Sequence, residues 1–61
     1  MAEELKRIRL MFKASRKQFG EWLGKSASMI QFYESGKSPI PETVIMLARV
    51  WEDFYKKMHN K

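Results

Sequence analysis

A chain of 61 residues with twelve Lys and Arg against seven Asp and Glu has a formal net charge of +5, and it contains no cysteine. A chain this short forms one small domain, and the missing cysteines exclude disulfides and thiolate metal sites. Its apolar fraction of 44% is too high for a disordered chain, yet no apolar run reaches the roughly 18–20 residues of a membrane span. We therefore expect one cytoplasmic domain over residues 1–61, with no membrane partner.

Residues 2 to about 12 are predicted to form the first helix. Leu5, Ile8 and Phe12 are spaced i, i+3 and i+7, which places them on one inward stripe. Two glutamates at its start and Lys13 after its end match the helix macrodipole.

A second helix is predicted to begin after Ser15, which is a favourable N-cap. Gln18, three residues later, completes a capping-box pattern. Phe19 and Leu23 are four residues apart and form the buried edge of this helix.

Two glycines shape the next turn. Gly20 lies within helix-forming sequence, where glycine costs roughly 0.5–1 kcal/mol relative to alanine, so we expect a close packing contact there. Gly24 lies where the apolar pattern breaks, which is typical of a C-terminal residue in the left-handed conformation. Ser26 can then cap a third helix. The spacing predicts two helices joined by a tight turn.

The third helix is predicted over residues 26–35, ended by Gly36. Ile30 and Tyr33 are three apart and point inward. The opposite stripe faces outward and holds Ala27, Ser28, Gln31 and Phe32.

The last helix is predicted over residues 42–58, after an extended connector at residues 38–41 whose two prolines disfavour helix. We prefer one continuous helix to two shorter ones with a bend. Its main apolar stripe comprises Val44, Leu47, Ala48, Trp51, Tyr55 and Met58, and Ile45, Val50 and Phe54 broaden it.

Positive charge concentrates in the segment that contains the turn. Residues 5–37 hold eight basic and two acidic side chains, whereas residues 38–61 hold four basic and three acidic ones. This distribution points to a polyanionic partner, although a solvated lysine-rich surface explains the charge equally well.

Together these features resemble the helix-turn-helix of the Cro and phage-repressor type, the XRE family, over residues 5–50. The residues that carry the resemblance are Ile8, Arg9, Ser15, Arg16, Phe19, Gly20, Leu23, Gly24, Ser26, Ile30, Tyr33, Glu34, Ser35, Gly36 and the Pro41, Glu42, Thr43, Val44 start of the last helix. The resemblance implies an all-α, lambda-repressor-like domain of four to five helices, with the helix-turn-helix at residues 16–35 and an extended C-terminal helix.

The resemblance also implies that residues 26–35 form a recognition helix in the major groove of double-stranded DNA. Base contacts are then expected from Ala27, Ser28, Gln31 and Phe32, although Phe32 has packing on a neighbouring helix or subunit as its alternative. Phosphate contacts are expected from Arg16, Lys17, Lys25, Ser26, Lys37 and Ser38. For any one of these lysines, simple solvation is the competing interpretation.

In this family Arg9 and Glu34 are expected to form a largely buried salt bridge between the first and third helices, with direct phosphate binding as the alternative for Arg9. Two positions depart from the family pattern. Lys25 stands where an apolar residue is usual, so its stem is expected to cover the core. Arg16 stands where glutamine is common. Both changes add charge near the DNA backbone, which raises affinity more than specificity.

The last helix is more apolar than a lone surface helix needs to be. Trp51, Phe54, Tyr55 and Met58 are expected to form a homodimer interface, which would place two recognition helices about one DNA turn, roughly 34 Å, apart. The alternative is that they fold back over the first helix. Trp22 fits either a surface or an interface position.

The sequence therefore predicts a sequence-specific DNA-binding regulator of transcription of phage or bacterial type, a dimeric repressor that occupies a short palindrome. No catalytic, metal or cofactor site is expected, because the single histidine, His59, has no second histidine or cysteine to join it. No small-molecule effector is expected from so short a chain. The alternatives are an antitoxin-like or accessory protein-interaction module, and an interaction domain that no longer binds DNA.

Overall fold

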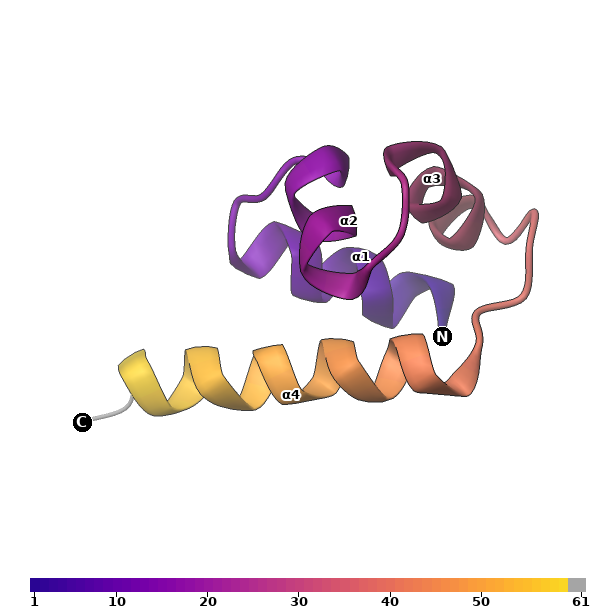
Figure 1. Ribbon diagram of the computed structural model, residues 1–61. Coiled ribbons are helices and arrows are strands. Elements are labelled where there is room, and N and C mark those ends of the chain that lie inside the picture. The colour runs from indigo at the N-terminus through magenta and orange to yellow at the C-terminus, as the bar shows by residue number, and fades with distance from the viewer. Residues whose placement is uncertain (60–61) are drawn as a thin grey trace.

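The computed structural model describes residues 1–59, and this part of the chain contains four α-helices and no strand. They are α1 (Ala2–Met11), α2 (Arg16–Leu23), α3 (Ala27–Ser35) and α4 (Glu42–His59). Figure 1 shows α1, α2 and α3 gathered along one side of the long helix α4. The all-helical expectation is confirmed, and α4 is one continuous helix of 18 residues rather than two.

Every helix contributes a fully buried apolar side chain to one core. Leu5 and Ile8 come from α1, Phe19 from α2, Ile30 from α3 and Ile45 from α4. These side chains recur at helical spacing in the sequence, so burying them together draws the four helices into one unit. Completing the core are Ala14, Leu23, Tyr33, Val44 and Ala48.

The end of α1 contains a backbone conformation that the sequence did not signal. Met11 is its last residue, and Lys13 has a φ of 55°, in the left-handed region that non-glycine residues rarely occupy. The Ala14 N–H donates to the Arg9 carbonyl at 3.2 Å and the Lys13 N–H to the Leu10 carbonyl at 3.0 Å. These bonds satisfy the last carbonyls of α1, as in glycine-ended helices, but with a lysine in the strained position.

Ion pairs fasten α1 to α4 along the rim of the core. Arg49 Nε lies 2.8 Å from Glu4 Oε2, and Arg7 Nη1 lies 2.7 Å from Glu52 Oε2. Within α4, the Lys56 ammonium gives Glu52 a second ion-pair contact at 3.4 Å. The Arg7 guanidinium hydrogen-bonds the Glu52 carboxylate and is the main reason why the pKa of Glu52 lies below its ordinary value.

The buried face of α4 differs from the predicted stripe. Leu47 and Met58 belong to the predicted apolar stripe, and Met58 also to the expected dimer interface, but within the chain they are 39% and 62% exposed. Val44, Ile45 and Ala48 face the core instead, and Glu52 is buried with them. The difference arises because α4 is apolar on two adjacent faces, and α1 covers only the one that also carries Glu52.

Candidate nucleic-acid interface

Short-range hydrogen bonds and one glycine determine where α2 begins and ends, and so where the turn to α3 starts. The Ser15 hydroxyl accepts the Gln18 N–H at 3.0 Å, and the Gln18 side chain accepts the Ser15 N–H at 3.0 Å, so the predicted capping box is present. At the other end of α2, Gly24 has a φ of 71°, the left-handed conformation predicted for it. These two features fix where α2 begins and ends.

Gly20 is the point of closest approach between α2 and the segment that follows it. A methyl group at Gly20 would collide with the main-chain carbonyl of Lys25, and it would also press on the main chain of Ser26. The Lys25 N–H donates to the Gly20 carbonyl at 2.8 Å, which holds the turn against the helix. The packing contact expected at Gly20 is therefore a backbone-to-backbone contact that tolerates no side chain.

Helix α3 is fixed at both ends. The Ser26 hydroxyl accepts the Met29 N–H at 3.1 Å as the N-cap. Gly36, with a φ of 79°, ends the helix, and the Lys37 N–H donates to the Phe32 carbonyl at 2.9 Å. Ile30 and Tyr33 anchor the inner face in the core, at 0% and 2% exposure.

The outer face of α3 is open to solvent. Ala27, Ser28 and Gln31 are exposed, as expected from the stripe opposite Ile30. Ser35, which was not among the predicted contacts, is exposed on the same face, and its hydroxyl donates to the Phe32 carbonyl at 3.2 Å. The helix therefore presents short polar side chains and one long amide outward.

Phe32 is half-buried at the edge of this face. The Lys37 ammonium lies 5.2 Å from the centre of its ring, within cation–π range. The ring belongs neither to the buried core nor to the half-buried side chains packed against it, so packing on a neighbouring helix does not account for it, whereas packing on a neighbouring subunit stays the alternative.

A buried carboxylate ties α3 to α1. Arg9 donates to Glu34 through Nε at 2.6 Å and through Nη2 at 3.1 Å, and its Nη1 donates to the Ala14 carbonyl at 2.9 Å. The side chains of Arg9 and Glu34 are only 9% and 4% exposed. This is the salt bridge implied by the family resemblance, and it commits Arg9 to structure rather than to an outside ligand.

Arg16 shares the same carboxylate from the solvent side. Its Nε lies 3.3 Å from Glu34 Oε1, while its side chain stays 44% exposed. Because the Arg16 side chain is largely in solvent, its contact with Glu34 contributes little to stability. Arg16 therefore lies beside α3 with part of its guanidinium group exposed to solvent.

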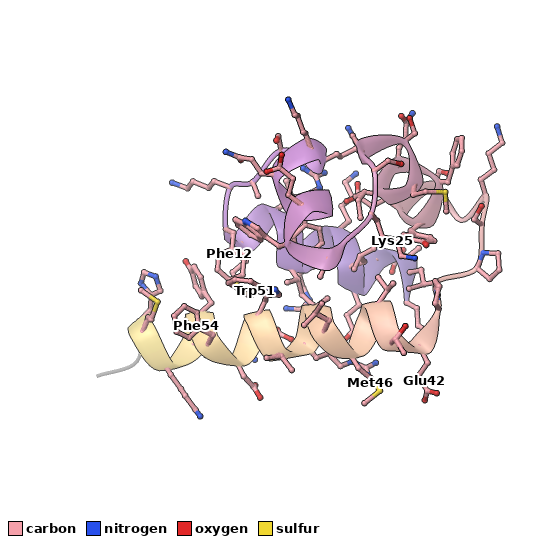
Figure 2. All side chains as sticks on the ribbon, viewed as in Figure 1. Phe12, Lys25, Glu42, Met46, Trp51 and Phe54 are labelled. Carbon is pink, nitrogen blue, oxygen red and sulfur yellow. The ribbon has the colours of Figure 1, made fainter. Side chains whose placement is uncertain are left out.

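Three lysines surround α3. Lys17 at the start of α2, Lys25 in the turn and Lys37 after α3 are all exposed. Lys25 is exposed as a residue, and its main chain makes the contact with Gly20; whether its stem covers part of the core stays a prediction. Figure 2 shows Lys25 beside the turn between α2 and α3.

The two serines expected to contact phosphate lie at opposite ends of α3. Ser26 is exposed at the N-terminus, and Ser38 is half-buried beyond the C-terminus, where its N–H donates to the Phe32 carbonyl at 3.3 Å. Ser26 leaves the free N–H groups of the first turn of α3 directed outward, a favourable setting for an anion.

The four aromatic and apolar residues assigned to a dimer interface divide into two groups. Trp51 and Tyr55 pack within the chain, their ring centres 6.1 and 5.0 Å from that of Phe12. For these two residues the alternative of folding back over the first helix describes the structure. Phe54 and Met58 remain 52% and 62% exposed.

Trp22 belongs to this aromatic cluster. Its ring stacks on Trp51 at 5.1 Å and meets Phe12 edge-on at 5.2 Å. Figure 2 shows Phe12 and Trp51 in the space between α4 and the helices above it. The cluster joins α2 to α4 at the end of the molecule where the core of aliphatic side chains stops.

Among residues 1–59 no group of three or more histidine or acidic side chains is arranged to hold a metal ion. His59 instead lies against Tyr55, with ring centres 4.2 Å apart. Within the same residues no helix combines the length and apolar character needed to cross a membrane.

Comparison with models of protein families, with curated proteins and with solved structures gives no match.

Proposed function

We propose that this protein is a sequence-specific double-stranded DNA-binding regulator of transcription, in which α2 and α3 act as a helix-turn-helix and α3 enters the major groove. One observation carries the proposal: α3 is locked to the core by Ile30, Tyr33 and Glu34, while Ser28 and Gln31 stay free on its outer face. Recognition of base edges requires a helix that is held firmly against the core and directs polar side chains toward the DNA.

Each outward side chain has a chemistry suited to the major groove. The Gln31 amide can donate to and accept from adenine in a bidentate pair, and Ser28 can donate or accept. Ala27 and the exposed edge of Phe32 can contact thymine methyl groups. These residues would supply sequence preference.

The surrounding cations suit the phosphate backbone on either side of the groove. Lys17, Lys25 and Lys37 are exposed around α3, and the N-terminus of α3 at Ser26 offers free N–H groups. Arg16 would exchange part of its contact with Glu34 for a phosphate, while Arg9 continues to neutralise the buried carboxylate.

In this proposal the protein acts as a repressor. Two copies would occupy the two halves of a short palindrome, with their α3 helices about one helical turn of DNA apart, and would block polymerase sterically. Control would come from protein concentration and operator occupancy.

The first test selects bound fragments from random duplex DNA and then compares Gln31→Ala with the wild type on the selected site. We expect the variant to lose about 1–3 kcal/mol on that site and to bind unrelated DNA as before. Equal losses on all sequences would show that Gln31 contacts no base.

The second test uses salt. Lys25→Ala should weaken binding to all duplexes and reduce the slope of log K against log salt by about 0.9, the value for one phosphate contact. Lys6→Ala is the matched control, because Lys6 is an exposed lysine on α1, outside the proposed interface. A chain that binds no duplex DNA at low salt would refute the proposed function outright.

A further inference from the structure

The side of α4 that α1 does not cover is an apolar surface with a shaped hollow. Met46, Leu47, Val50, Phe54 and Met58 are between 39% and 62% exposed along it. The hollow, of about 380 Å³, is lined by Leu47, Val50, Trp51 and Phe54 of α4 and by Trp22 of α2. Exposed apolar side chains scattered singly need no explanation, but a contiguous row on one helix indicates an interaction surface.

The spacing of the lining residues identifies what fits the hollow. Leu47, Val50, Trp51 and Phe54 occupy positions i, i+3, i+4 and i+7 of one helix. Four residues at this spacing form the hole that receives one side chain of a facing helix in knobs-into-holes packing. The occupant is therefore an apolar side chain carried on a second α-helix.

We propose that the occupant is a second copy of this chain, whose α4 packs antiparallel against the first around a two-fold axis near Val50. In this arrangement Val50 of each copy covers the hollow of the other, and Leu47 of one copy meets Phe54 of the other. The same row of residues supplies both the knobs and the holes, as a two-fold interface requires.

Charge sets the direction of the pairing. The first turn of α4 is acidic, with Glu42, and its last turn is basic, with Lys56, Lys57 and His59. An antiparallel pair brings the acidic end of each helix to the basic end of the other, whereas a parallel pair brings like charges together at both ends. Antiparallel helices also oppose their macrodipoles favourably.

This interface leaves the proposed DNA-binding surface free. The hollow includes no residue of α3. Figure 2 shows Glu42 and Met46 projecting from α4 on the side away from the other three helices. This surface would join the two copies in the proposed function, but it consists of α4 and Trp22 of α2, and the pairing does not require that α3 binds DNA.

Sedimentation of the full chain without DNA tests the association. We expect a reversible dimer at micromolar concentration, and Val50→Glu should raise its Kd by about tenfold or more, because a knob at the centre of the seam becomes a buried charge. Leu10→Glu is the matched control and should leave the Kd unchanged, since Leu10 is 53% exposed on α1 against 62% for Val50. Far-UV circular dichroism of both variants establishes that they fold.

Cysteine cross-linking tests the direction, because the native chain has no cysteine. Under mild oxidation Thr43→Cys should cross-link to Lys57→Cys in a mixture, and neither variant should cross-link to itself. A wild-type chain that sediments as a monomer up to hundreds of micromolar, or a Val50→Glu variant that associates like the wild type, overturns the second copy as the occupant. Self-cross-linking of Thr43→Cys overturns the antiparallel arrangement. None of these results depends on DNA, so they are independent of the test of the proposed function.

Discussion

Replacing Glu34 with alanine removes the carboxylate that ties α3 to α1. Arg9 then keeps only the Ala14 carbonyl as a partner, although its side chain is 9% exposed. Removing one partner of a buried ion pair costs about 3–5 kcal/mol, because the remaining charge is buried without compensation. A domain of this length has a total stability of about 3–9 kcal/mol. Glu34→Ala should therefore lose at least about a third of the free energy of unfolding, and all of it if the total lies at the low end of that range.

Urea denaturation at neutral pH, followed by far-UV circular dichroism, measures this loss as a lower midpoint with an unchanged slope. Two controls separate burial from charge. Glu21→Ala removes an exposed carboxylate of α2 and should change stability by less than about 0.5 kcal/mol. Arg16→Ala removes the exposed partner of Glu34 and should cost at most about 1 kcal/mol.

A double variant completes the test of the buried pair. Arg9→Met combined with Glu34→Leu replaces both charges with apolar side chains, so it should be more stable than Glu34→Ala alone. If Glu34→Ala loses less than about 1 kcal/mol, the pair does not hold α3 in the way described and the reasoning fails.

Three further predictions follow from the backbone and from the ion pairs of α4. Gly20→Ala should lower the unfolding midpoint in urea, although alanine favours helix by about 1 kcal/mol, because its methyl group meets the Lys25 carbonyl; a raised midpoint would contradict that contact. Lys13→Gly should raise the urea midpoint, with a gain of up to about 1 kcal/mol in the free energy of unfolding, because glycine relieves the left-handed strain at that residue. An unchanged midpoint would show that the strain is absent. Glu52 contributes stability above its ordinary pKa of 4.5, because contact with Arg7 lowers its pKa in the folded state, and this contribution disappears as the pH falls through the lowered pKa. Glu52→Gln should thus be less stable than the wild type at neutral pH, and thermal melts should converge on acidification; a constant difference at every pH would refute this linkage.

The boundaries of the two middle helices were predictable because local chemistry determines them. Ser15 and Gln18 cap each other across three residues, and Gly24 and Gly36 adopt left-handed conformations that end α2 and α3. Such signals act within one turn of chain and can be identified without knowing the fold. The outward stripe of α3 follows in the same way from the inward spacing of Ile30.

Local sequence signals did not predict which face of α4 packs against the core. Leu47 and Val50 are as apolar as Val44 and Ala48, so periodicity alone offered two faces and gave no reason to choose between them. The choice depends on α1, whose Arg7 reaches Glu52 from 45 positions away in the sequence. A buried carboxylate looks like surface charge until its distant partner is known.

In the candidate site, too, some features were predictable from local sequence and others depended on the packing of distant residues. Exposure of Ser28 and Gln31 followed from the sequence, whereas the sharing of Glu34 between Arg9 and Arg16 required the packing of three helices. Contact of any of these residues with a base or a phosphate stays a prediction. The Lys13 conformation had no sequence signal, since the residue that favours it, glycine, is absent from that position.

The contact between Trp22 and Trp51 gives this protein a built-in optical reporter. They are the only two tryptophans of the chain, and they come from different helices, with stacked rings 5.1 Å apart. Indoles this close couple electronically, so their near-ultraviolet dichroism and emission should respond to any displacement of α4 from α2. Because both rings also line the hollow, the same signal should register its occupation without an attached dye.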